Sequence, residues 1–329
     1  MNTPVLSVRD LVIDFEGRPA QPALVQGVNF DVLPGQSVAL IGESGCGKTL
    51  TSLAILGLLP PRMRVASGSI VLGGVDVLRA SERKLRDLRG RTIGAIFQEP
   101  MSSLNPTMTV GDQIGESRRL HLGESRRSAR VKAVELLDRV GIPNAGERAR
   151  AYPHELSGGM QQRVMIAAAI ACDPAIVLAD EPTTALDATV QADILQLLED
   201  LRKDLGLGIL FVTHDLGVVA DFCEQVVVMY AGHVVERAGT DALFGTPRHP
   251  YTEALLGAVP QAGRARTMLS VVPGRVPPSG SLPEGCRFRP RCGYALEPCR
   301  HAQHGNTSDV HFTFCDRVAD GDLVLGSKS

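Results

Sequence analysis

Residues 1–240 are predicted to form an α/β domain built on a parallel sheet. Two apolar runs of strand length, Ser37–Ile41 and Ala175–Ala179, are each followed by a helix-like segment. Strands that alternate with helices in this way form a parallel sheet with helices on both faces. A glycine-rich turn separates the first run from the helix-like Leu50–Leu59, and two carboxylates follow the second run. These observations predict a doubly covered sheet with polar chemistry at the ends of its strands.

A helical insertion is predicted between these strands, within Glu99–Tyr152. In Ser117–Val140 the apolar residues Val131, Val134, Leu137 and Val140 recur about three residues apart behind a basic stretch. The arginines of that stretch are Arg118, Arg119, Arg126, Arg127 and Arg130, and they alternate with Glu116, Glu124 and Glu135. Interleaved charges are typical of a solvated helix face, so this interpretation is preferred to nucleic-acid binding.

Composition changes after Gly245, where nine of the chain's 21 prolines fall within Pro247–Pro298. A continuing sheet would be interrupted repeatedly by these residues. We therefore place a domain boundary near residue 240, with a separate C-terminal extension over residues 241–329.

Length, charge and hydropathy limit the possible functions. The 329 residues suffice for one large domain or two, and the formal charge of −2 gives no global attraction for nucleic acid or anionic lipid. Met1–Asp10 has no charged region followed by an apolar run. The longest apolar stretches, Leu53–Pro61 and Ile166–Cys172, are shorter than the roughly 18 residues that span a bilayer. The sequence predicts a cytosolic chain that does not cross a membrane itself.

The glycine-rich turn has the form of a phosphate-binding loop. Gly42-Glu43-Ser44-Gly45-Cys46-Gly47-Lys48-Thr49 follows a strand and precedes a helix, which is the context this motif requires. Its glycines let successive N–H groups surround phosphate oxygens, and the helix N-terminus adds favourable dipole charge. Lys48 is expected to reach the β- and γ-phosphates, and the Thr49 hydroxyl to coordinate Mg²⁺. The loop alone does not separate an ATPase from a GTPase or a small-molecule kinase.

Two further patterns point to hydrolysis and to a second anion site. The run Ala175–Ala179 ends in Asp180-Glu181, a costly pair unless a cation or a reacting water uses it. Asp180 is expected to help hold Mg²⁺, and Glu181 to orient and deprotonate the attacking water. Leu156-Ser157-Gly158-Gly159-Met160-Gln161-Gln162-Arg163 places a serine and two glycines at a helix start, an anion site with no phosphate loop nearby in sequence.

With these motifs the chain resembles the ATP-binding cassette family, whose signature is Leu-Ser-Gly-Gly-Gln or a close variant. Met160 replaces the usual glutamine. The resemblance implies a cassette over residues 1–240, with a RecA-like parallel-sheet core, an antiparallel β subdomain and a helical subdomain at about 99–157. Six motifs occur in family order over roughly 170 residues, far more specific than a phosphate loop alone.

The resemblance also assigns further residues. Gln98 matches the glutamine that senses Mg²⁺ and the attacking water, and His214 matches the histidine that contacts the γ-phosphate. Ala185-Leu186-Asp187 matches the loop that crosses to a partner subunit. Phe15 sits where the family stacks an aromatic ring, commonly tyrosine, on adenine, although a core phenylalanine is the alternative. The implied ligands are ATP and Mg²⁺, and the signature around Ser157, Gly158 and Gly159 is expected to close over ATP held by another subunit.

Two segments favour the importer branch of the family. Arg248-His249-Pro250-Tyr251-Thr252-Glu253-Ala254-Leu255-Leu256 resembles the extension of dipeptide, oligopeptide and nickel importer ATPases, and Phe97–Pro106 is similar to that branch. The resemblance implies an ATPase, a translocase subunit peripheral on the cytoplasmic face of the inner membrane. Its implied partners are a homologous ATPase subunit, two membrane permeases and an extracytoplasmic binding protein. Dipeptides, oligopeptides, nickel, glycosides and opines remain open as substrates, and a non-transport cassette ATPase is the more distant alternative.

Four cysteines crowd the extension, namely Cys286, Cys292, Cys299 and Cys315. In a reducing compartment such thiols point to a metal site rather than to disulfides. Their gaps of five, six and fifteen residues lack the close pair typical of zinc sites and suit an iron–sulfur cluster better. The pattern also resembles peptide-importer ATPases, some of which hold a four-iron cluster. Zinc and free structural thiols are the alternatives, and Cys46, Cys172 and Cys223 are expected to be small core or loop residues.

Overall fold

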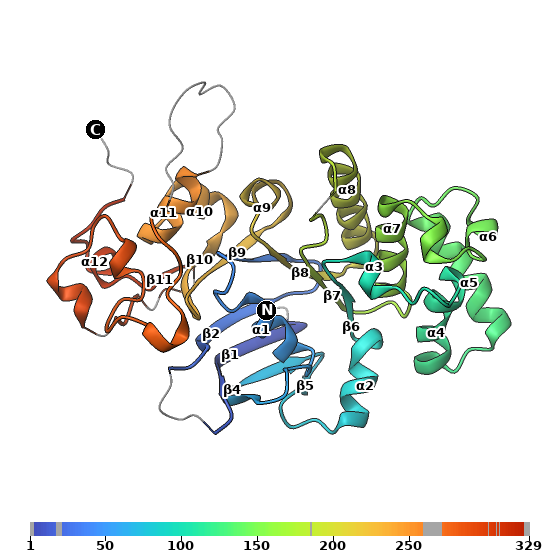
Figure 1. The fold of residues 1–329 in the computed structure, drawn as a ribbon, viewed down its shortest axis with the longest axis horizontal. Coiled ribbons are helices and arrows are strands. Elements are labelled where there is room, and N and C mark those ends of the chain that lie inside the picture. The colour runs from blue at the N-terminus through green and yellow to red at the C-terminus, as the bar shows by residue number, and fades with distance from the viewer. Residues whose placement is uncertain are drawn as a thin grey trace. The chain divides into compact units, whose positions relative to one another are not determined.

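A computed structural model of the chain describes residues 3–17, 22–184, 186–258, 272–301, 303–306, 308 and 310–325. The chain forms two compact units, each assembled from several segments. The first contains Met1–Ser7, Asp31–Gln36 and Val71–Phe211, and the second contains Val8–Phe30, Ser37–Ile70 and Val212–Ser329. Figure 1 labels their elements along the chain.

The first unit combines parallel strands with a group of helices. β6 (Ile93–Ile96) pairs in parallel with β7 (Ile176–Asp180), which neighbours β8 (Gly208–Thr213). The expected strand at Ala175–Ala179 is confirmed, one residue further along. The remaining elements are β5 (Val75–Asp76), α2 (Glu82–Arg91), α3 (Pro100–Ser103), α4 (Val110–Leu122), α5 (Arg126–Arg139), α6 (Ala145–Arg148), α7 (Gly158–Ala169) and α8 (Ala188–Leu205).

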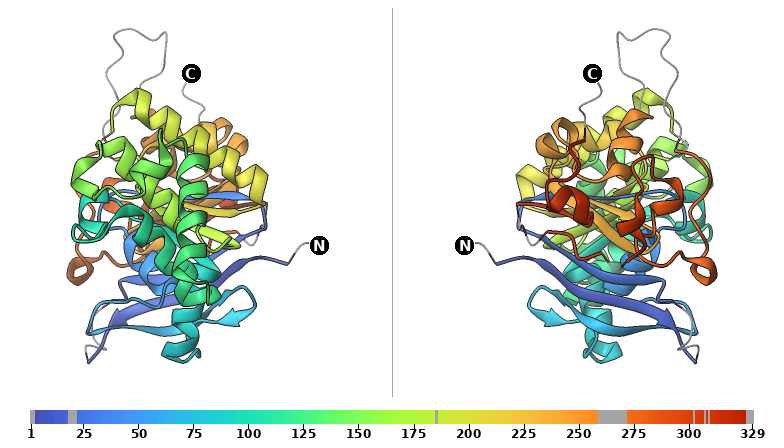
Figure 2. Two further views of the ribbon diagram at one scale, coloured as in Figure 1. Left: turned by 90° about the vertical axis from the view of Figure 1, so that its right-hand side faces the viewer. Right: turned by 90° about the vertical axis from the view of Figure 1, so that its left-hand side faces the viewer.

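The expected helical insertion is present as several helices, which Figures 1 and 2 show together in green as α4 to α7. The basic stretch divides between α4 and α5, because Gly123 ends α4 in the left-handed region and the Ser125 side chain caps α5. The predicted apolar face needs correction at Val131, which is 57% exposed. The buried stripe runs through Ala129, Ala133, Leu136 and Leu137, which recur every three to four residues, and Val131, two residues from Ala129 and from Ala133, lies off this face.

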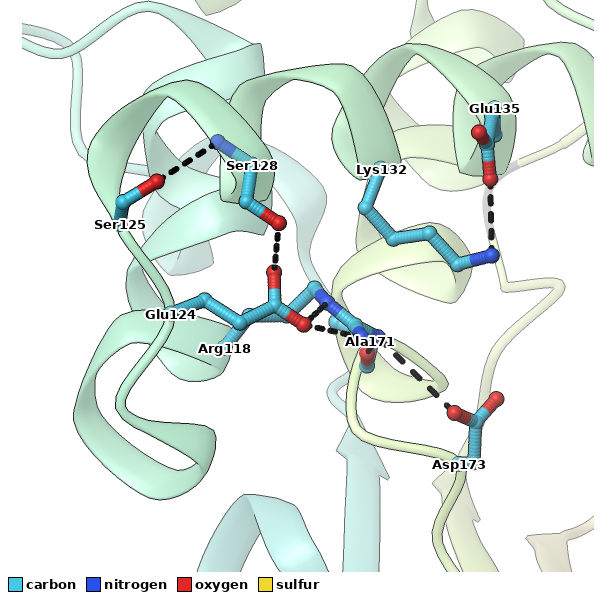
Figure 3. Close-up of polar contacts among 8 residues, drawn as sticks. All are labelled: Arg118, Glu124, Ser125, Ser128, Lys132, Glu135, Ala171 and Asp173. Atoms are coloured by element: carbon cyan, nitrogen blue, oxygen red, sulfur yellow. Dashed lines mark hydrogen bonds and ion pairs between the residues drawn. The ribbon is translucent and has the colours of Figure 1, made fainter.

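The predicted solvated face also needs correction at Arg118, which is only 8% exposed. Its guanidinium donates to the Glu124 carboxylate from Nε (2.9 Å) and to the carbonyl oxygen of Ala171 (Figure 3). The Glu124 bond raises the pKa of Arg118 and lowers the pKa of Glu124. This arginine therefore joins α4 to the segment between α7 and β7.

In the second unit, β3 (Ser37–Ile41) pairs in parallel with β9 (Gln225–Tyr230), which confirms the expected first buried strand. The antiparallel neighbours β10 (His233–Gly239) and β11 (His311–Thr313) follow β9. The strands β2 (Val25–Val32), β1 (Leu6–Phe15) and β4 (Met63–Leu72) lie in that order in a smaller sheet. Further elements in this unit are α1 (Lys48–Ile55), α9 (Leu216–Phe222), α10 (Thr240–Gly245), α11 (Pro250–Gly257) and α12 (Asp316–Ala319).

The proline-rich extension packs on β10 through a buried acid. Glu236 is fully buried and accepts hydrogen bonds from the backbone N–H groups of Arg248 (2.6 Å) and His249 (2.9 Å). His311 Nε2, in β11, lies 2.8 Å from the same carboxylate. Three groups from two segments therefore satisfy a charge that would be expensive to bury alone. Figure 2 shows the C-terminal segments in red beside the orange strand β10.

Among the helices of the described residues, none is both long and apolar enough to cross a membrane.

Candidate active site

The predicted phosphate loop lies between β3 and α1 in the second unit. Gly42 has no room for a side chain, because a Cβ there would lie 2.2 Å from the carbonyl oxygen of Met229. Gly47 adopts φ 109° at the N-terminus of α1, a conformation that glycine tolerates. Ser44, Gly45 and Thr49 are exposed, whereas Cys46 is buried. The loop is therefore tightly packed at Gly42 and exposed at Ser44, Gly45 and Thr49.

Lys48 folds back onto the loop. Its Nζ donates to the carbonyl oxygens of Gly42 (2.6 Å) and Glu43 (3.3 Å), and the residue is only 7% exposed. Cys46 Sγ lies 3.8 Å from the same Nζ, and burial raises the pKa of that thiol. The Lys48 ammonium therefore lies against the backbone carbonyl groups of the loop itself.

The predicted carboxylate pair lies at the end of β7 in the first unit. Asp180 is the last strand residue, and Glu181 adopts φ 47°, in the left-handed region that is unfavourable for a residue with a side chain. Glu181 Oε2 accepts hydrogen bonds from Gln98 Nε2 (2.8 Å) and from the Thr184 hydroxyl (3.0 Å). The structure therefore joins two predicted site residues that lie 83 positions apart in sequence.

The predicted signature lies at the start of α7, also in the first unit. Ser157 caps the helix by accepting a hydrogen bond from Met160 N (3.4 Å), and Ser157 and Gly158 are exposed. Gln162, buried in α7, donates to the carbonyl oxygen of Pro182, the residue after Glu181 (2.6 Å). This hydrogen bond connects α7 to the turn that follows Glu181. Sequence reasoning assigned no role to Gln162, which stands within the Leu156–Arg163 motif, or to Thr184, which lies between the carboxylate pair and the predicted crossing loop.

Three other predicted residues lie at chain ends or turns. Phe15 is the last residue of β1 and is half-buried, and His214 is exposed immediately after β8. Asp187 caps α8 by accepting from Val190 N (2.9 Å). Ala185, in the same predicted crossing loop, lies outside the described residues.

The four cysteines of the extension carry free thiols and line one small pocket. Burial raises the pKa of Cys286 to about 12 and that of Cys292 to about 11. Neighbouring thiols contribute to both shifts, so the thiols are close enough to influence one another. In the part of the chain that the structure describes, no three His, Cys, Asp or Glu side chains are arranged to hold a metal ion. The donor chemistry fits a thiolate-ligated centre, but the arrangement does not form a ready-made site.

The fold and the motif geometry agree with comparisons to known proteins. The chain belongs to the ABC transporter family, whose profile matches residues 25–184. The profile of the oligopeptide/dipeptide transporter C-terminal region matches residues 235–299.

Curated relatives cover nearly the whole chain. A putative peptide import ATP-binding protein of Brucella melitensis is 51% identical over 311 residues, covering 91% of this chain and 92% of that protein. The dipeptide transport ATP-binding protein DppD of Bacillus subtilis is 44% identical over 328 residues, covering 98% of both chains.

Solved structures show the same fold. cbiO1 of Clostridium perfringens, part of an ABC transporter complex, has a TM-score of 0.63 at 26% identity and covers 74% of this chain and 91% of its own. A dimeric ATP-binding cassette in a post-hydrolysis state with ADP and Pi has a TM-score of 0.60 at 28% identity, covering 71% and 98%.

Proposed function

We propose that the chain is the ATP-hydrolysing subunit of a peptide importer. The observation that carries this proposal is the hydrogen bond from Gln98 to Glu181, the carboxylate that follows β7, in a chain that also has a phosphate loop. The peptide assignment is supported by the relatives' names and by the C-terminal profile. An importer of nickel or another small solute is the second candidate, since no residue of this chain is expected to touch the substrate.

The proposed mechanism uses the residues in the following roles. Lys48 and the loop N–H groups of Gly42–Thr49 bind the β- and γ-phosphates, and Phe15 stacks on adenine. Thr49, Gln98 and Asp180 are the residues proposed to hold Mg²⁺, whose positive charge would neutralise the negative charge of the phosphates. Glu181 accepts a proton from the water that attacks the γ-phosphorus, so that ADP and inorganic phosphate are released. His214 contacts the γ-phosphate.

The hydrogen bonds at Glu181 give this role a physical basis. Gln98 and Thr184 both donate to one oxygen, Oε2, and the left-handed backbone fixes the residue that carries it. A carboxylate held in this way needs little reorganisation to orient a water molecule.

Replacing Glu181 tests the assignment. Glu181→Gln should keep Mg-ATP binding but hydrolyse ATP at least about 100-fold more slowly, as expected for loss of a general base. Lys48→Ala should instead weaken nucleotide binding. Near-normal ATPase activity of Glu181→Gln, measured with a partner whose own site is inactive, would contradict the role of Glu181.

We further propose that two cassettes share each ATP, with Ser157, Gly158, Gly159 and Asp187 acting on nucleotide held by a homologous partner. The exposed cap at Ser157 and the solved dimeric relative support this arrangement. Ser157→Arg should impair the partner's site in a mixed dimer. Impairment confined to the ATP bound by the same chain's Lys48 would refute the composite site.

The remaining partners are two membrane permeases and an extracytoplasmic binding protein, which would place the chain peripherally on the cytoplasmic face of the inner membrane. The permeases are expected to dock on the helical subdomain, residues 99–157, within a cassette of residues 1–240. A hollow of about 280 Å³ lies where this subdomain meets the segment after β6 and helix α7, lined in part by Phe97, Met108 and Met165. Phe97 is 40% exposed and adjoins Gln98, so a permease in this hollow would act next to Glu181. Met108→Asp should abolish co-purification with the permeases if this surface is used.

The cysteine pocket of the extension, residues 241–329, is proposed to hold a [4Fe–4S] cluster through Cys286, Cys292, Cys299 and Cys315. The convergence of four thiols on one pocket supports this assignment. Protein purified without oxygen should contain iron and labile sulfide and absorb broadly near 400 nm, and Cys292→Ser should lose both. Stoichiometric zinc in the anaerobic protein, or four thiols that alkylate in the native protein, would contradict the iron–sulfur assignment.

A further inference from the structure

The C-terminal extension reaches the phosphate loop through one residue, Glu43. Tyr251, in α11, accepts a hydrogen bond from the backbone N–H of Glu43 (2.9 Å) through its hydroxyl oxygen. Arg291 Nη1 lies 3.1 Å from each oxygen of the Glu43 carboxylate. Two residues of the extension, outside the cassette motifs, therefore contact both the backbone and the side chain of Glu43.

The two residues that hold Glu43 are themselves fixed by burial. Tyr251 is fully buried, with its ring 4.7 Å from Tyr230 and 5.3 Å from Phe288 between ring centres. The Arg291 side chain is only 6% exposed, and its Nε donates to the carbonyl oxygen of Pro273 (2.7 Å). Its guanidinium carbon also lies 5.6 Å from the centre of the Tyr230 ring. Such side chains lose little further freedom when they hold a partner.

The contact leads directly to the lysine of the loop. Lys48 Nζ donates to the carbonyl oxygens of Gly42 and Glu43. The Gly42 carbonyl belongs to the same peptide group as the Glu43 N–H that Tyr251 binds, and Arg291 binds the side chain of Glu43. On the far side of the loop, the carbonyl oxygen of Cys46 accepts from Gly232 N (2.9 Å). The loop is thus restrained at both ends of its turn.

We propose that the extension is a working part of the nucleotide site, in which Arg291 and Tyr251 are positioning residues that hold Glu43 and set the affinity of the phosphate loop for nucleotide. Two effects act in the same direction. Tyr251 fixes the peptide of Glu43, which lowers the cost of ordering the loop when phosphate binds. Arg291 pairs with a carboxylate that would otherwise repel the phosphates of the nucleotide.

Removal of the ion pair tests the electrostatic part. In the full chain, Arg291→Met should raise the Kd for a non-hydrolysable Mg-ATP analogue about 5- to 10-fold, a part of what a hydrogen bond to a charged group can contribute. Adding Glu43→Gln should recover at least half of this loss on a logarithmic scale, because the repelling carboxylate is gone. The control is Arg300→Met, which removes the exposed Arg300–Glu297 pair (3.2 Å) in the same extension and should leave the Kd within about twofold.

The peptide contact is tested separately. Tyr251→Phe keeps the ring between Tyr230 and Phe288 but removes the acceptor for Glu43 N–H, and should raise the Kd about threefold or more. Thermal melting of each variant checks that it is folded. The proposal is overturned if folded Arg291→Met and Tyr251→Phe bind nucleotide as wild type does, or if Glu43→Gln restores nothing, since a purely structural role would not depend on the Glu43 charge. If Arg291→Met does not fold, Tyr251→Phe decides the proposal, and an unchanged Kd in the folded Tyr251→Phe variant overturns it.

Discussion

Arg118 gives the sharpest prediction about stability, because one buried guanidinium serves several acceptors (Figure 3). It donates to Glu124 and to the carbonyl oxygen of Ala171, and lies 3.9 Å from the Asp173 carboxylate. Arg118→Met keeps much of the side-chain volume and removes every donor.

The expected magnitude comes mainly from the Ala171 carbonyl. Loss of a donor to a buried acceptor costs about 1–3 kcal/mol of unfolding free energy. Asp173 adds little, since its side chain is 65% exposed. Because Arg118 lowers the pKa of Glu124, that pair stabilises the fold above the ordinary Glu pKa and loses this effect as pH falls. The penalty of Arg118→Met should therefore be smaller in acid than at neutral pH.

Urea unfolding at neutral and acidic pH measures both effects. The matched control is Arg126→Met, which removes an exposed pair with Asp112 (3.1 Å) and should cost less than about 1 kcal/mol. If Arg118→Met were no more destabilising than Arg126→Met, or if its penalty increased in acid, the reasoning from the buried network would be refuted.

Three further predictions concern single contacts. Gly42→Ala should abolish nucleotide binding or folding, because its Cβ would collide with the carbonyl oxygen of Met229. Gly45→Ala, where the backbone is strained at φ +81° but the Cβ meets no atom within 4 Å, should be milder, and equal binding losses in a nucleotide titration would contradict this. Thr184→Val should lower kcat for ATP hydrolysis several-fold, about the effect of one hydrogen bond to a charged group, with little change in KM, and a change in KM alone would show that Thr184 does not act through Glu181. Burial lowers the pKa of His249 to about 3, so between about pH 6.5 and 3 only the unfolded chain takes up this proton. The unfolding free energy should therefore fall by up to about 1.4 kcal/mol per pH unit below 6.5, and thermal melting should show that His249→Asn lacks this pH dependence.

The order of the motifs was sufficient to predict the family and the form of the strands that carry the phosphate loop and the carboxylate pair. Ser37–Ile41 and the strand before Glu181 are continuous apolar runs that are buried on both faces, and such runs leave little choice of structure. The glycine positions of the phosphate loop carry their own steric requirement, which is visible in the sequence.

Side-chain partners were not predictable in the same way. Arg118 looks like its exposed neighbours in sequence, and only the packing of α4 against the segment after α7 buries it. Val131 belongs to a run of apolar residues spaced three apart, and such a run drifts around a helix of 3.6 residues per turn, so the buried stripe falls on Ala129, Ala133, Leu136 and Leu137 instead.

The sequence by itself therefore determined which chemical groups this protein has and which strand or helix presents them, because backbone geometry follows from local pattern. Only the tertiary structure decided that Gln98 meets Glu181, and that Tyr251 and Arg291 of the extension meet Glu43. These pairs are separated by 83, 208 and 248 residues. A contact at such a distance depends on how whole elements pack, and no local periodicity encodes it.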